Sequence, residues 1–220
     1  VIILSLPTVP IFHTVINEIE NCSYFTDPKV IIDMNTISLE DKLGAKNKLE
    51  KLNISFVDAP VSGTGAQAKT KDLVVMSSGS EKIIDDCKDI FDSFARKNIF
   101  VGEFGNGIKF KILANLLVTV HNTVTAEALL LGQKVGLDSQ KIYEVLNEGA
   151  AKSVMLDKRM PLMISEDYEP ATASMRIFLK YIDVISNFLK DNSMISPTFD
   201  AAAALYNQSK DNIPITYDTA

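Results

Sequence analysis

The stretch GNGIKFKILANLLVTVHNTVTAEALLLGQKVG, residues 105–136, decides how the rest of the chain is interpreted. Apolar residues recur in it at steps of three and four, which is the spacing of one side of a helix. The spacing predicts a single long helix that opens at a Gly-Asn-Gly turn. Its apolar positions are Ile112, Leu116, Val120, Val124 and Ala128, with Leu113, Leu117 and Leu131 beside them.

Two polar residues interrupt this apolar pattern. Lys111 and Asn115 are four residues apart, so a helix places them on one face. An ammonium group that donates a proton and a carboxamide that fixes geometry can together hold a carbonyl or hydroxyl oxygen. On spacing alone, a pair of solvated surface residues is the more common explanation, and only the rest of the chain changes that balance.

Composition narrows the class of protein. The chain has 220 residues, 46% of them hydrophobic and 23% charged, as in a soluble globular protein of one large domain or two small ones. The net charge of −6 argues against nucleic acid as a partner. Cys22 and Cys87 lack a Cys-x-x-Cys spacing, and His13 and His121 are isolated, so we expect no metal site, no disulfide framework and a cytoplasmic location. The longest apolar run, residues 112–120, is too short to span a membrane, and no signal peptide is visible.

The order of elements predicts the fold class. Short apolar runs alternate with helical segments over the first hundred residues, which indicates βαβ units and a mainly parallel sheet. After Gly107 only helices are expected. We therefore predict an α/β plus all-α fold: a truncated, Rossmann-like domain over residues 1–104, then an all-helical domain over 105–220, joined by the long helix. Expected strands are 1–6, 30–34, 55–59, 73–77 and 98–101; expected helices are 9–20, 38–53, 81–95, 107–135, 139–147, 153–164, 172–190 and 197–209.

A small-residue loop follows the third expected strand. The sequence DAPVSGTGA spans Asp58–Ala66, at the carboxyl end of a strand, where open α/β sheets bind their ligands. Ser62 supplies a hydroxyl, and Gly63 lets backbone amides approach a ligand closely. A bound carboxylate is one interpretation. An ordinary glycine-rich turn fits the composition at least as well.

Several motifs together resemble the β-hydroxyacid dehydrogenase family, almost from end to end. DAPVSG at 58–63 resembles its substrate-binding motif, and GNGIKFKILAN at 105–115 resembles its catalytic motif, Gly-x-Gly-x-x-x-Lys-x-x-x-Asn. LSLPT at 4–8, DMNT at 33–36 and a lysine seventeen residues before Pro197 resemble segments that line its cofactor site. The resemblance implies catalytic roles for Lys111 (not Lys109) and Asn115, substrate contacts by Ser62, Gly63 and Thr64, and cofactor contacts by Leu6, Pro7, Thr36 and Lys180.

The resemblance also implies the reaction. A hydride would pass between NAD or NADP, with NAD preferred, and the carbinol carbon of a small hydroxycarboxylic acid. Lys111 would exchange the proton, and partial burial should lower its pKa from ~10.4 toward ~7–8. The segment KSVMLDKRMPLMISEDYEP at 152–170 is similar to the branch that oxidises sugar acids such as L-threonate, which would bring Ser153 to a substrate hydroxyl. A plain amphipathic helix explains that segment equally well.

Departures from the family pattern keep other classes open. The Gly-x-Gly-x-x-Gly cofactor fingerprint would precede Val1, so we expect an N-terminally truncated chain that binds cofactor poorly and is inactive alone. The chain could also be a cofactor-binding relative without catalysis, or a helical oligomerisation module. If the protein is an enzyme, we expect it to form a homodimer or homotetramer. The substituted positions are Asn35, Thr64, Gln67, Lys71, Ala114 and Tyr181.

Overall fold

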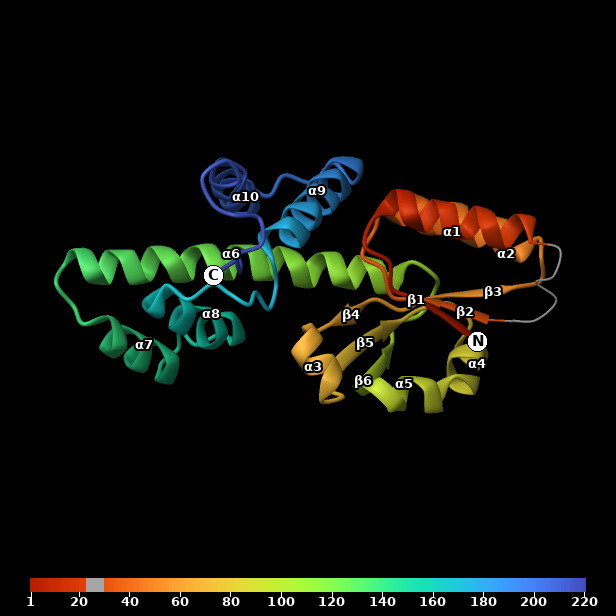
Figure 1. Ribbon diagram of the computed structural model, residues 1–220, viewed down its shortest axis with the longest axis horizontal. Helices are drawn as coiled ribbons and strands as arrows, with labels where there is room; N and C mark the ends of the chain where they lie inside the picture. The colour runs from red at the N-terminus through yellow and green to blue at the C-terminus, as the bar shows by residue number, and fades with distance from the viewer. Residues whose placement is uncertain (23–29) are drawn as a thin grey trace. The chain divides into compact units, whose positions relative to one another are not determined.

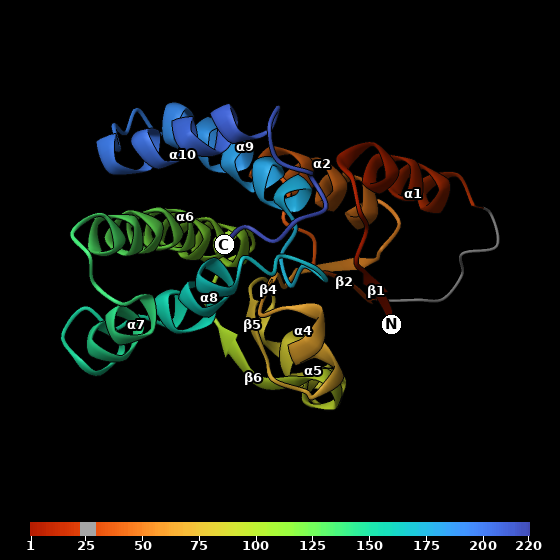
Figure 2. The same ribbon diagram turned by 60° about the vertical axis from the view of Figure 1, so that its left-hand side comes forward.

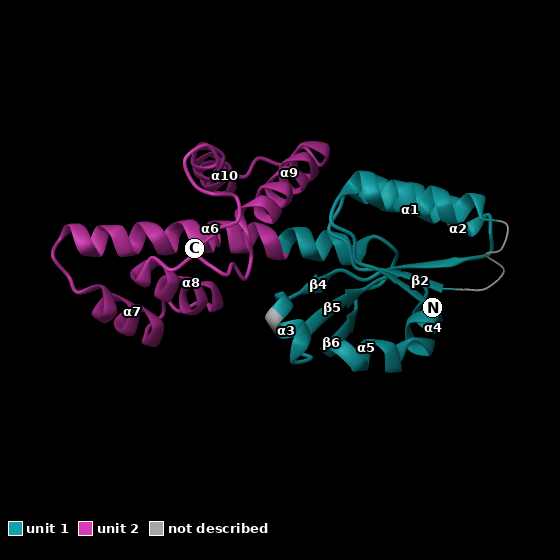
Figure 3. Cartoon of the chain, viewed as in Figure 1, with its two compact units in different colours: residues 1–113 teal, residues 114–220 magenta. Residues whose placement is uncertain are grey.

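The structure, a computed structural model, describes residues 1–22 and 30–220 of the chain (Figure 1). The chain divides into two compact units, residues 1–113 and 114–220 (Figure 3). The division falls inside the helix α6 (Asn106–Lys134), so the first two turns of α6 belong with the sheet. The sequence-based boundary at 104/105 lies just before this helix, and the roles assigned there to the two domains stay predictions.

The first unit holds the strands. The strands β1 (Ile2–Leu4), β2 (Val30–Asp33) and β3 (Ser55–Asp58) pair in parallel in that order. A second three-stranded sheet has the order β4 (Val61–Ser62), β5 (Leu73–Ser77) and β6 (Ala95–Phe100), with β4 antiparallel and β6 parallel to β5. An isolated antiparallel bridge between Asp58 and Ser78 connects the ends of β3 and β5. The predicted α/β plus all-α fold is confirmed.

The helices of this unit follow the predicted order with two refinements. They are α1 (Val9–Asn21), α2 (Leu39–Glu50), α3 (Gly65–Lys69), α4 (Glu81–Asp86) and α5 (Lys88–Phe94). Ser38 caps α2, because its Oγ accepts a hydrogen bond from Asp41 N at 3.0 Å. The single helix expected over 81–95 is interrupted at Cys87, where ψ rises to 8°, and the short elements β4 and α3 were not predicted.

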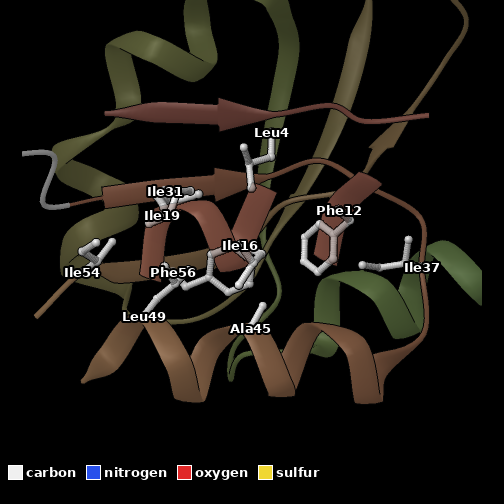
Figure 4. Close-up of a cluster of buried hydrophobic side chains, with 10 residues drawn as sticks. All are labelled: Leu4, Phe12, Ile16, Ile19, Ile31, Ile37, Ala45, Leu49, Ile54 and Phe56. Carbon is white, nitrogen blue, oxygen red and sulfur yellow. The ribbon is translucent and has the colours of Figure 1, made fainter. Parts of the chain in front are cut away.

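The strands of the first sheet are covered on both faces. One cluster joins α1 and α2 to the side chains of one face, including Ile31 and Phe56 (Figure 4). The neighbouring residues Ile32 and Val57 point to the opposite face and pack with Phe91 of α5. Successive strand residues alternate between faces, so nearly continuous apolar runs are what a doubly covered sheet requires.

The second unit is helical. Besides residues 114–134 of α6, it contains α7 (Ser139–Glu148), α8 (Val154–Ser165), α9 (Met175–Asp191) and α10 (Pro197–Ser209). The helices α9 and α10 lie side by side in both ribbon views (Figures 1 and 2). Leu129, Ile142, Leu156 and Met160 form a buried cluster of α6, α7 and α8. These helix bounds lie within three residues of the predicted ones.

The buried face of α6 is partly polar. Thr119 and Asn122 are at most 1% exposed, whereas Leu117 is 55% and Leu131 65% exposed. Apolar residues surround much of this helix, so their spacing alone does not select the face that is buried. By length and composition α6 also meets the criteria for a membrane span, and one third of the window that meets them is buried. A single such helix is weak evidence, since core helices of soluble proteins pass the same test.

Candidate active site

The parallel strands bring three predicted site segments to one edge of the sheet. Leu4 pairs with Asp33, and Asp33 pairs with Asp58, so β1, β2 and β3 end at the same level. The chain segments that follow these residues contain Leu6 and Thr36 among the predicted cofactor contacts. Ligands of open parallel sheets bind at this edge, outside the carboxyl ends of the strands.

Asn35 connects two of these segments. Its Oδ1 accepts a hydrogen bond from Leu6 N at 2.6 Å, and its Nδ2 donates to Asp33 Oδ1 at 2.5 Å. Thr36 beside it is buried, Leu6 is half-buried and Pro7 is exposed. Asn35 stands where the family motif has serine, and its longer side chain makes both of these contacts.

The glycine-rich loop adopts a conformation that explains its residues. Ser62 lies in β4 with an exposed side chain. Gly63 has φ +131°, and a Cβ there would lie 2.6 Å from Leu73 Cδ2, so this position requires glycine. Thr64 has φ −106° and begins α3, a conformation that a β-branched residue adopts readily. Gln67 stabilises this start, since its Oε1 accepts from Thr64 N at 3.1 Å.

Lys111 and Asn115 lie one turn apart on the continuous helix α6. Lys111 is only 9% exposed, and burial lowers its pKa to about 8. Asn115 is 5% exposed, and its Nδ2 has no hydrogen-bond partner. A buried amide donor without a protein partner is costly in a folded protein, and this one is available to donate a hydrogen bond to a bound molecule. The surface explanation for this pair is therefore wrong.

An unpredicted ionic cluster lies beneath the carboxyl edge. Lys42, Asp33 and Asp58 are fully buried; Lys42 Nζ is 2.5 Å from Asp33 Oδ2 and 2.8 Å from Asp58 Oδ1. Desolvation raises the pKa of Asp33, while the two carboxylates raise the pKa of Lys42 above its ordinary value despite its burial. Two features of the sequence could have indicated this cluster. An aspartate ends each of the adjacent strands β2 and β3, and a lysine lies near the start of α2, the helix that follows β2.

The Gly-x-Gly turn seats α6 against the sheet. Gly105 has φ +91°, and a Cβ there would lie 2.5 Å from Leu39 Cδ1. At Gly107 a Cβ would lie 2.5 Å from Met76 O and 2.8 Å from Asp58 Oδ2. The backbone of α6 can approach the strands this closely only because glycine has no side chain.

Two further predicted site residues lie in the second unit. Ser153 caps α8, with its Oγ accepting from Leu156 N at 3.0 Å, so its hydroxyl already has a structural role. Lys180 lies in α9, with Nζ 5.2 Å from the centre of the Tyr181 ring, and burial lowers its pKa. Tyr181, where the family has aspartate, thus provides an aromatic neighbour to this lysine. Among the described residues, no group of three or more His, Cys, Asp or Glu side chains forms a metal site.

A Rossmann-like unit followed by a helical unit is the fold of two-domain hydroxyacid dehydrogenases, and the buried Lys111 and Asn115 lie on the helix common to both units. Two family models match: the NAD-binding domain of 6-phosphogluconate dehydrogenase at residues 1–102, and the NAD-binding region of NADP-dependent 3-hydroxyisobutyrate dehydrogenase at 105–219. The chain belongs to the β-hydroxyacid dehydrogenase family.

Individual relatives agree with this assignment. L-threonate dehydrogenase of Pectobacterium atrosepticum is 33% identical over 162 residues, which cover 73% of this chain and 53% of that protein. Glyoxylate/succinic semialdehyde reductase 2 of Arabidopsis thaliana is 26% identical over 83% of this chain and 51% of its own length. The structure of 3-hydroxyisobutyrate dehydrogenase from Salmonella typhimurium superposes with a TM-score of 0.85 at 25% identity, covering all of this chain and 75% of that one. The chain thus spans about half the length of the curated relatives it matches.

Proposed function

We propose that this chain belongs to an NAD(P)-dependent dehydrogenase that interconverts a small hydroxycarboxylic acid and its carbonyl form. One observation carries the proposal: Lys111 is buried with a pKa of about 8, and the unpartnered amide of Asn115 lies one turn further along the same helix. A lysine whose pKa lies near working pH can both accept and return a proton. The family match supports the same reaction class.

The residues divide the chemical work. In oxidation, neutral Lys111 Nζ accepts the proton of the substrate hydroxyl, and in reduction the ammonium returns it. Asn115 Nδ2 donates a hydrogen bond to the same oxygen and holds it in place for the proton transfer. Ser62 and the backbone at Gly63 hold the substrate carboxylate. When bound, NAD(P) supplies the hydride acceptor or donor.

The carboxyl edge of the first sheet fits that cofactor. The Leu6–Pro7 turn offers apolar surface, Thr36 lies in the adjacent segment, and Asn35 holds the two segments together. Lys180 is the cofactor contact assigned to the helical unit, where its lowered pKa and partial burial suit a lysine beside a ligand. NAD is preferred over NADP by family habit alone.

The relatives and the hydroxyl group of Ser153 support a proposal for the substrate class. We propose 3-hydroxyisobutyrate, glycerate with tartronate semialdehyde, or L-threonate as substrate. Ser153 accepts a hydrogen bond as the cap of α8, which leaves its own hydroxyl hydrogen free to donate to a substrate oxygen. A sugar acid such as L-threonate carries additional hydroxyls that would use this donor.

The enzyme is further proposed to act in the cytoplasm as a homodimer or homotetramer. The support for an oligomer is the exposed apolar surface of α6 in the second unit, where Leu117, Val124, Leu130 and Leu131 are each about half or more exposed. Apolar surface of this kind is typical of subunit interfaces. Light scattering of the purified protein measures the mass directly, and a monomer would contradict the proposal.

Turnover tests the proposed activity. The complete gene product that contains this chain is assayed with NAD and NADP on 3-hydroxyisobutyrate, glycerate and L-threonate. We expect oxidation of one substrate, loss of nearly all turnover in Lys111→Ala, and near-normal turnover in Lys109→Ala, whose side chain is exposed two residues earlier. Normal kcat in Lys111→Ala would refute the catalytic assignment. Cofactor binding without turnover on any acid would instead support the non-catalytic relative.

A further inference from the structure

Asp58 is a central contact of the first unit. It ends β3, is fully buried, and uses both carboxylate oxygens. Its Oδ1 faces Lys42 Nζ at 2.8 Å. Its Oδ2 accepts hydrogen bonds from Ser78 Oγ and from Ile108 N, both at 2.9 Å. A single side chain of the sheet therefore meets a buried cation, a strand-end hydroxyl and the first turn of α6.

Ser78 adds a second anchor to the same helical turn. Its Oγ donates to Asp58 Oδ2 and accepts from Gly107 N at 3.0 Å. The first amides of a helix have no partner within the helix, and the partial positive charge there favours a nearby carboxylate. Two consecutive amides of α6, at residues 107 and 108, are thus satisfied from the sheet and not by water.

The charges behind Asp58 hold it in one position. Lys42 Nζ bridges Asp58 and Asp33, and all three side chains are fully buried. Burying such a group costs free energy, which the ion pairs and hydrogen bonds offset only when the geometry is fixed. Removing one partner leaves a buried charge uncompensated, so the cluster tolerates little movement of its members.

The anchored turn of α6 lies next to Lys111, the lysine of the proposed reaction. Lys111 follows Ile108 by three residues and so lies within one helical turn of the anchored amide. We propose that Asp58, held by Lys42 and Ser78, is a positioning residue that sets the place of Lys111 by anchoring the first turn of α6. The inference rests on the proposed function for the role of Lys111, but the anchoring itself is measurable without turnover.

The chain offers a matched pair of variants for the test. Ser78→Ala removes a donor to Asp58 and the acceptor of Gly107 N. Ser77→Ala removes a hydroxyl that is equally buried, one residue earlier, and that has no hydrogen-bond partner. Amide exchange by NMR reports the first turn of α6, and a pH titration of the lysine side-chain resonances reports Lys111, assigned by its absence in Lys111→Met.

We expect Ser78→Ala to speed exchange of the amides at 107 and 108 about tenfold, as loss of a buried hydrogen bond implies. Greater hydration of the loosened turn should raise the pKa of Lys111 from about 8 toward its ordinary 10.5. Ser77→Ala should change neither quantity. Equal effects of the two variants on both quantities would overturn the positioning role.

Steady-state kinetics of the same variants distinguish a failure of this inference from a failure of the proposed function. In the complete gene product, Ser78→Ala should lower kcat about tenfold with little change in the KM for substrate, while Ser77→Ala keeps the parent values. If the parent itself turns over no hydroxyacid, the proposed function fails, yet altered exchange and lysine pKa in Ser78→Ala alone would still support the anchoring.

Discussion

Replacing Lys111 by methionine should remove catalysis and at the same time stabilise the protein. Methionine has a similar length and no charge, so it fits a position that is only 9% exposed. The buried ammonium is less favourable than a solvated one, which is why the pKa of Lys111 falls from 10.5 to about 8. The side chain that the proposed reaction needs is therefore one that the fold accommodates at a cost.

The magnitude follows from the two pKa values. They differ by about 2.5, and one pKa unit corresponds to about 1.36 kcal/mol, so the penalty at pH 7 is about 3 kcal/mol. Because the unfolded chain binds this proton more tightly, the penalty is fully present below pH 8 and disappears as the pH rises from about 8 to 10.5. At pH 9 it should be about 1 kcal/mol smaller than at pH 7.

Urea unfolding tests this prediction by measuring the free energy of unfolding at two pH values. Far-UV circular dichroism suits the chain, which contains no tryptophan, and titrations at pH 7 and pH 9 give the free energy of unfolding of each variant. We expect Lys111→Met to gain roughly 2–3 kcal/mol at pH 7 and less at pH 9. Lys109→Met, at an exposed position of the same helix, should stay within about 0.5 kcal/mol of the parent. A loss of stability at pH 7, or a gain independent of pH, would refute the reasoning.

Three further predictions rest on single features. Gly107→Ala should lower the free energy of unfolding by about 2 kcal/mol or more, because its Cβ would lie 2.5 Å from a carbonyl oxygen of β5. Gly44→Ala, which has open space inside α2, should raise the free energy of unfolding by about 0.5–1 kcal/mol. Equal changes for the two variants in urea unfolding would contradict this. Asn35→Ser should speed exchange of the Leu6 amide about tenfold by removing its acceptor, and unchanged exchange would argue against the link. The kcat/KM for oxidation should rise about tenfold per pH unit up to about pH 8, where Lys111 loses its proton, and a flat profile would exclude this lysine as the base.

Local patterns predicted much of the fold. Runs of apolar residues bounded by turn residues gave the order of β1, β2, β3 and β5, and periodicity placed the helices of the second unit within a few residues. Strand β4 and helix α3 were missed, since such short elements carry too few residues for any periodicity.

For the candidate site, too, local patterns predicted some features and the tertiary structure decided others. The spacing of Lys111 and Asn115 already placed them on one helical face, and the family motifs singled out Ser62 and Gly63. Whether that face is buried depended on which side of an apolar helix meets the rest of the protein. Apolar spacing alone could not decide this, because Leu113 is 53% exposed although it belongs to the apolar pattern.

By itself, the sequence determined the class of fold, the family and the one helical turn that carries the proposed chemistry, because helix, strand and motif signals act between residues close in the chain. Tertiary structure alone decided the cluster of Asp33, Lys42 and Asp58 and the anchoring of α6 by Ser78. These partners lie up to 50 residues apart, as between Asp58 and Ile108, and only strand register and the close approach of Gly107 bring them together. The lowered pKa of Lys111 has the same origin, since desolvation depends on what packs around a group and not on its neighbours in sequence.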